Sequence, residues 1–186
     1  NLLDWTIDQR PPSASLPEGS PASRAHVADA SESVPAFSVY VAYSIFTGLP
    51  TATNRHPKIW IASSSDCGTT FSPPVMLSRE VHASQGASMA VDPLTGTVYV
   101  VWRSFGTEDD HPSESEADRI YMNKSTDGGR TWLYEPIVVT SLIAYDQATT
   151  GSSFRTLAFP SVAVSVDATG KSRVHVAYTS RAANVA

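Results

Sequence analysis

The sequence predicts an all-β protein built from repeated four-stranded antiparallel units. Short apolar runs rich in β-branched and aromatic residues alternate with turn signals through most of the chain, without long helical periodicity. Three of these runs are near-copies of one another, FSVYVAYS, TVYVVWRS and RVHVAYTS, beginning at Phe37, Thr97 and Arg173. A turn motif also occurs twice, as SSSDCGTTF at 63–71 and KSTDGGRTW at 124–132. Regular recurrence of this kind indicates stacked copies of one structural unit.

Each unit divides into four strands, A to D, in chain order. Strand A ends in an aspartate and is expected at 26–29, 88–92 and 163–167. Strand B is the near-copied run and is expected at 37–44, 97–104 and 173–180. Strands C and D flank the turn motif and are expected at 58–64 with 70–77 and at 119–125 with 131–139. Because strand B is apolar on both faces, we expect neighbouring sheets to cover both sides of each sheet.

The two copies of the turn motif place the same residue types at the same spacing. An aspartate carboxylate can accept hydrogen bonds from the N–H groups of its own turn, and glycine supplies the positive φ that the turn requires. The aromatic residue that ends the motif is expected to fold back beneath the turn and to be buried between sheets in both copies. The matched positions are Ser64, Asp66, Gly68, Thr70 and Phe71 in the first copy and Ser125, Asp127, Gly129, Thr131 and Trp132 in the second.

The motif pattern S-x-D-x-G-x-T-[W/F] is similar to the Asp-box, or BNR repeat, of sialidases and other secreted β-propellers. The resemblance implies a β-propeller of four-stranded blades with the Asp-boxes between strands C and D. It also implies that the box residues are structural, because the boxes of these families lie away from the active site. The blades are expected at about 25–80, 85–140 and 158–186, after an extended Pro/Ser-rich segment at 1–24.

The third expected blade is incomplete. Too few residues follow Tyr178 to reach another Asp-box, so strands C and D of this blade are missing from the sequence. Closed propellers have four to eight blades, and each blade buries its faces against its neighbours. We therefore expect about two and a half blades of a larger propeller, completed by further sequence or by a partner chain.

In such a propeller the loops that join strand B to C and strand D to A share the face opposite the Asp-boxes. These loops are expected at 45–56, 78–87, 104–118 and 140–159, and they are long and polar. Arginine side chains can pair with an anionic group through two parallel hydrogen bonds, so arginines on this face are candidate ligand contacts. The predicted ligand-binding residues are Arg79, His82, Arg103, Tyr145, Asp146 and Arg155.

Catalysis is not predicted from this stretch of sequence. Sialidases bind a sugar carboxylate with three arginines and use a Tyr–Glu nucleophile with an acid–base aspartate. The first of these arginines would precede Pro160 by two residues, where this chain has Ala158, and the preceding repeat has Gln85. Phe154 and Arg155 match half of that motif but are displaced by three residues.

Three functions therefore remain open, and whether the protein is an enzyme is not decided. The first is an exported, sialidase-like module that binds a glycan or another extracellular ligand on its loop face. The second is a portion of a glycoside hydrolase whose catalytic residues lie mostly outside this chain. The third is a structural or protein-interaction propeller within a larger assembly.

Composition excludes several other classes of function. A formal net charge of −5 without a basic run argues against nucleic-acid binding, and no apolar stretch reaches the roughly 20 residues of a membrane helix. The single cysteine, Cys67, rules out an internal disulfide and a cysteine-based zinc site. Asp109 and Asp110 offer oxygen atoms for Ca²⁺, but their loop lacks the order of a known calcium loop, so no cofactor is predicted. The chain begins at Asn1, as a processed exported protein or a fragment would.

Overall fold

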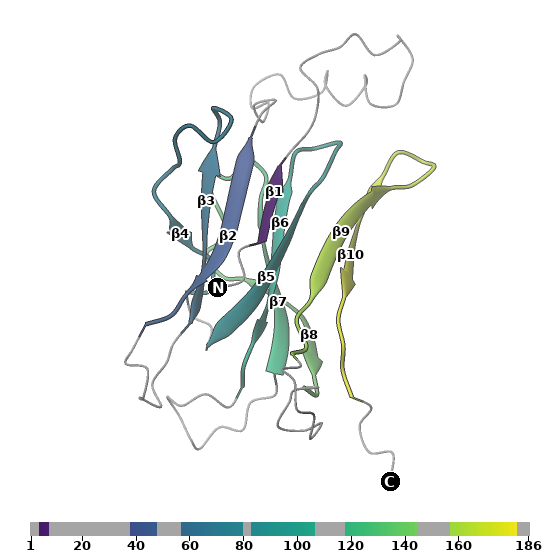
Figure 1. Ribbon diagram of the computed structural model, residues 1–186. Coiled ribbons are helices and arrows are strands. Elements are labelled where there is room, and N and C mark those ends of the chain that lie inside the picture. Colours follow the sequence, from purple (N-terminus) through teal and green to yellow (C-terminus); the bar gives the residue numbers. More distant parts are fainter. Residues whose placement is uncertain are drawn as a thin grey trace.

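The computed structural model describes residues 4–7, 38–47, 57–79, 83–106, 118–144 and 157–181. These residues form ten β-strands, which are grouped into three antiparallel sheets (Figure 1). No helix occurs among them, and hence none that could cross a membrane. The prediction of an all-β, antiparallel fold is therefore confirmed for this part of the chain.

The first sheet has the strand order β1–β2–β3–β4. Its strands are β1 (Asp4–Ile7), β2 (Val39–Ile45), β3 (Lys58–Ser64) and β4 (Val75–Met76). Strands β2, β3 and β4 lie where strands B, C and D were predicted. The position beside β2 is taken by β1, from the predicted extended segment, and the predicted strand at 26–29 lies outside the described residues.

The second sheet repeats this order as β5–β6–β7–β8. Its strands are β5 (Ser84–Val91), β6 (Val98–Ser104), β7 (Asp118–Ser125) and β8 (Ile137–Leu142). The register also repeats, because Val39 pairs with Ser64 in the first sheet and Val98 pairs with Ser125 in the second. The serine that opens each turn motif thus stands opposite the start of strand B in both sheets.

Strand D is shorter than the sequence predicted in both sheets. The fourth strands begin at Val75 and Ile137, several residues after the turn motif, rather than directly behind it. Pro73 and Pro74 precede β4, and Pro136 precedes β8. Proline has no N–H to donate to a strand ladder, so the continuous ladder begins only after it, although the Ser72 N–H still donates to the Ser63 carbonyl at 2.8 Å.

The third sheet consists of β9 (Ser161–Val166) and β10 (Ser172–Ala177), which lie beside the second sheet in Figure 1. Side-chain hydroxyls link the two sheets. The Ser88 hydroxyl accepts from the backbone N–H of Val162 at 3.3 Å. The Ser172 hydroxyl donates to the carboxylate of Asp92 at 2.8 Å. The strands predicted at 163–167 and 173–180 are thus present, and among the described strands β10 pairs only with β9.

The main hydrophobic core lies between the first and second sheets. Its buried members come from both sheets and are Tyr40, Ala42, Ile59, Ile61, Leu77, Met89, Val98, Val100 and Trp102. Strand β6 is buried on both faces, because Val100 and Val101 are both inaccessible to solvent. One face of β6 packs in this core, and β9, which contacts β5 and β6, covers the other face.

Candidate functional site

The two turn motifs are held by the same contacts of a serine hydroxyl. Ser64 Oγ donates to the Asp66 carboxylate at 2.6 Å and accepts from the backbone N–H of Gly68 at 2.8 Å. In the second turn, Ser125 Oγ likewise donates to the Asp127 carboxylate at 2.7 Å and accepts from the backbone N–H of Gly129 at 2.8 Å. Each hydroxyl thus ties the end of strand C to the glycine of the turn.

The aspartate carboxylates complete both turns by accepting from the threonine that follows. The backbone N–H of Thr70 lies 2.9 Å from Asp66 Oδ1, and its hydroxyl lies 2.6 Å from Oδ2. Thr131 donates to Asp127 through the same two groups. Hydrogen bonds from Ser64 and Thr70 lower the pKa of Asp66 from 3.8 to about 2. Burial opposes this effect at Asp127, but the bonds from Thr131 and Ser125 outweigh it and lower its pKa as well.

The predicted burial of the aromatic residue is wrong for the first turn. Trp132 is half-buried, packs against the main core and donates from Nε1 to the carbonyl of Gly129 at 3.1 Å. Phe71 is 47% exposed. The reason is the neighbouring sheet, because a Cβ built on Gly129 would meet Tyr40 of β2 at 3.0 Å and Ser63 of β3 at 3.4 Å. The second turn therefore lies on the first sheet, whereas about half of the Phe71 side chain remains in solvent.

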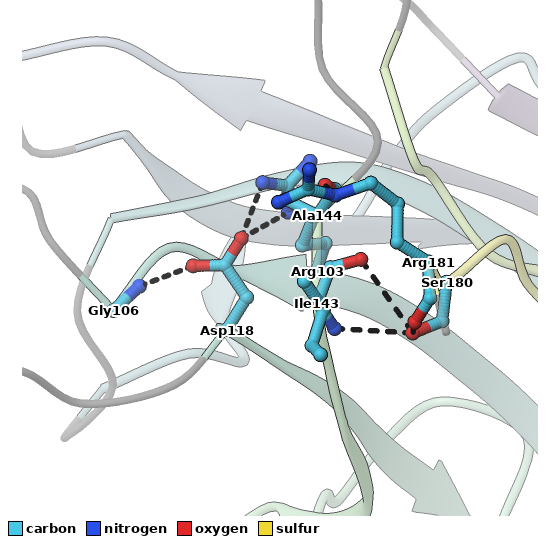
Figure 2. Close-up of polar contacts among 7 residues, drawn as sticks. All are labelled: Arg103, Gly106, Asp118, Ile143, Ala144, Ser180 and Arg181. Carbon is cyan, nitrogen blue, oxygen red and sulfur yellow. Dashed lines mark hydrogen bonds and ion pairs between the residues drawn. The ribbon is translucent and has the colours of Figure 1, made fainter. Parts of the chain in front are cut away.

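An ion pair between a buried arginine and a partly buried aspartate joins the end of β6 to the start of β7 at the other end of the second sheet. Arg103 at the end of β6 is 1% exposed, and its Nε donates to Asp118 Oδ2 at 3.0 Å. Asp118 begins β7, and its Oδ1 accepts from the backbone N–H of Gly106 at 2.7 Å. Figure 2 shows the Asp118 carboxylate between the Arg103 side chain and the Gly106 backbone. The guanidinium carbon also lies 4.2 Å from the centroid of the Phe105 ring.

The segment that follows β10 reaches the same end of the second sheet. The backbone N–H of Ile143 donates to the Ser180 hydroxyl at 3.1 Å, and the N–H of Arg181 donates to the Ile143 carbonyl at 3.0 Å. Arg181 Nε donates to the carbonyl of Ala144 at 3.1 Å (Figure 2). Since Leu142 pairs with Asp118, these contacts lie at the sheet end that carries this ion pair.

The structure describes two of the six predicted ligand residues. Arg79 follows β4, where its Nε donates to the Met76 carbonyl at 3.3 Å and its guanidinium carbon lies 5.5 Å from the centroid of the Tyr134 ring. Arg103 is bound to Asp118 at the end of β6, so the two arginines contact different elements of the fold. The predicted residues outside the described ranges are His82, Tyr145, Asp146 and Arg155.

Sequence reasoning missed Asp118 and Tyr134. Asp118 falls in the polar loop expected at 104–118, although the predicted end of strand B at Ser104 and the predicted start of strand C at Arg119 already put it near Arg103. No pattern in the sequence brings Tyr134 to Arg79, because Arg79 follows β4 of the first sheet and Tyr134 lies between β7 and β8 of the second. Within the described ranges no group of three or more His, Cys, Asp or Glu side chains is placed to hold a metal ion. Asp109 and Asp110 lie outside those ranges.

Comparison with known proteins leaves the family of the chain open. No model of a protein family matches it, and no curated protein matches it. The resemblance of the two turns to Asp-boxes therefore stays a prediction from the sequence.

Proposed function

We propose that the chain is part of an exported, sialidase-like Asp-box β-propeller whose loop face binds a glycan or another extracellular ligand. Two consecutive sheets with the same strand order and register support this proposal. Each carries the motif in its third turn, with the same serine, aspartate and threonine contacts. The pair β9–β10 packs on the second sheet as the start of a third blade would.

The observation that carries the loop-face assignment is the buried contact between Arg103, Asp118 and Gly106. It joins the end of β6 to the start of β7, where the loop at 104–118 is predicted, at the sheet end opposite the second turn motif. Removing one partner of a buried ion pair costs about 3–5 kcal/mol, and a smaller cost is expected here because the Asp118 side chain is 12% exposed. The contact thus holds the two strand ends together. Loops held on a rigid scaffold are where binding residues concentrate. In this proposal Arg103 supports the loop rather than contacting the ligand, because its guanidinium is buried against Asp118.

The proposal does not include catalysis by these residues. Gln85 and Ala158 occupy the positions at which the sialidase motif would place its first arginine. Ala158 is buried and has no group that could pair with a sugar carboxylate. A hydrolase would therefore need its carboxylate-binding arginines and its Tyr–Glu pair from elsewhere.

Glycan-array binding and hydrolysis of a fluorogenic sialoside, measured on the same preparation, test the proposal. Binding without turnover is expected, and Arg155→Ala in the predicted loop 140–159 should weaken it. Lys171→Ala is the matched control, because it removes one positive charge at an exposed position in the turn between β9 and β10. Turnover would identify a glycoside hydrolase instead. The absence of both binding and turnover would favour a structural or protein-interaction propeller.

A further inference from the structure

A groove with a volume of about 290 Å³ lies where the outer strand of the first sheet meets the segment after the second turn. Met76 of β4 and Arg79 line one side, and residues 130–134 line the other. This volume lies just below the roughly 300 Å³ at which pockets for whole ligands begin, so the groove has room for one sugar ring of a longer chain rather than for a complete oligosaccharide. It is separate from the loop base at Arg103 and Asp118, which lines none of it.

Two arginines give the groove its charge. Arg79 and Arg130 are exposed, and neither is paired with a carboxylate among the described residues. The Arg79 Nε bond to Met76 orients that side chain and leaves the two terminal amino groups of its fork for another acceptor. The backbone N–H of Arg130 donates to Asp127 Oδ1 at 3.1 Å, which anchors Arg130 to the turn. The Asp127 carboxylate is thus engaged by the turn itself.

Two aromatic side chains give the groove apolar surface beside these charges. Trp132 is half-buried, and its only polar atom is already bonded to the Gly129 carbonyl, so its exposed part is apolar. Tyr134 is 64% exposed, and the Arg79 guanidinium lies 5.5 Å from its ring centroid. An aromatic ring next to unpaired guanidinium groups suits a ligand that has a flat apolar face and an anionic group on one molecule.

We propose that this groove binds a saccharide carrying an anionic group, either a carboxylate or a sulfate. Arg79 and Arg130 pair with the anion, and the rings of Trp132 and Tyr134 lie against the C–H face of the sugar. An acidic peptide offers the charge without the flat ring, so the aromatic side chains favour the saccharide. This inference does not rest on the loop-face proposal, because it assigns Arg79 to the groove and uses none of the other residues predicted for the loop face.

Calorimetric titration of the full chain with defined hexasaccharides tests the groove. The probes are a sulfated heparin hexasaccharide, a carboxylated hexagalacturonate and neutral cellohexaose, with polyaspartate as a polyanion that contains no sugar. At least one of the two anionic probes should bind, and neutral cellohexaose and polyaspartate should bind at least about tenfold more weakly. Because heparin carries carboxylates as well as sulfates, binding of hexagalacturonate shows that a carboxylate suffices, and binding of heparin alone shows that sulfate is required. Arg79→Ala and Arg130→Ala should each weaken that binding about tenfold or more, since each removes a charge-assisted contact.

Two further variants separate this site from a general charge effect and from the loop face. Tyr134→Ala should weaken saccharide binding several-fold without changing the net charge, and thermal melting should confirm that it folds like the parent. Lys171→Ala removes one positive charge outside the groove and should leave the affinity within about twofold. The proposal would be overturned if Arg130→Ala and Lys171→Ala lost affinity equally. It would also be overturned if polyaspartate bound as tightly as the anionic saccharides, or if neither anionic saccharide bound. A loss confined to Arg155→Ala would place the sugar on the loop face and equally overturn the groove.

Discussion

The two turn motifs share one hydrogen-bond network but differ in what lies beneath them. The serine, aspartate and threonine contacts agree to within 0.2 Å for all bonds that the two turns have in common. Trp132 nevertheless packs against the core, whereas Phe71 is 47% exposed. The motif therefore determines the conformation of its own turn, whereas a neighbouring sheet determines whether the aromatic side chain is buried.

The second strands of the two sheets show the same contrast. Strand β6 is buried at six of its seven residues, because the first sheet covers one face and β9 contacts the other. Strand β2 alternates instead, with Tyr40 and Ala42 buried and Val41 and Tyr43 half-exposed. Both strands are apolar on both faces in sequence, so their burial differs through their neighbours rather than through their composition.

The largest expected effect separates the two aromatic residues. Trp132→Ala should lower the free energy of unfolding by about 3 kcal/mol, because it empties a space against the core. Phe71→Ala should cost less than about 1 kcal/mol, since half of the ring is already in water. Urea denaturation of both variants and the parent measures the difference. Equal losses would mean that Phe71 is covered in solution by a part of the protein outside the described residues.

A methyl group added to each turn glycine should destabilise the second turn more than the first. Gly68 and Gly129 have φ values of +83° and +87°, so alanine costs about 1–2 kcal/mol at either position. At Gly129 the new Cβ would also press on Tyr40 at 3.0 Å, and Tyr40 is fully buried and cannot move aside. We expect Gly129→Ala to cost at least about 1 kcal/mol more than Gly68→Ala in thermal unfolding. Similar melting temperatures would contradict the contact between the second turn and the first sheet.

The serine hydroxyls should show no such difference. Ser64→Ala and Ser125→Ala each leave the turn N–H groups without their acceptor, which costs about 1–2 kcal/mol. Because the contacts are the same in both turns, the two losses in unfolding free energy should agree within about 0.5 kcal/mol. Thr126→Ala is the control, since this exposed threonine lies in the second turn and takes no part in the contacts described. A clear inequality would show that the local networks are not equivalent.

The smallest effect is expected from acid, because both carboxylates lie near the solvent. The folded pKa of Asp66 is about 2, below its ordinary value of 3.8, so the folded state binds fewer protons than the unfolded state in this window. Its stabilising contribution is therefore complete above pH 3.8 and is lost as the pH falls toward 2. Asp66→Asn and Asp127→Asn should each reduce the acid dependence of the unfolding free energy, measured by denaturant titration at several pH values. An unchanged dependence in both variants would show that other carboxylates dominate it.

Much of the fold could be predicted from the sequence because it depends on local patterns. The near-copied runs located β2, β6 and β10, and the turn motif located the ends of β3 and β7. The turn contacts followed as well, since the serine, aspartate and threonine bond to one another within a single turn. The sequence did not predict that Arg103 is engaged by Asp118, because that contact depends on two side chains that lie 15 residues apart in the chain. The predictions at His82, Tyr145, Asp146 and Arg155 lie outside the described ranges.

The sequence by itself determined most of the strands and both turns, because a strand period and a turn network depend only on residues close along the chain. Only the tertiary structure decided which turn buries its aromatic residue, which strand stands beside β2, and which residues meet Arg79 and Arg103. Those outcomes depend on how one sheet lies against another and on which strand takes a sheet edge. Near-identical repeat units therefore have different surroundings, and the surroundings determine burial and the grouping of charged side chains.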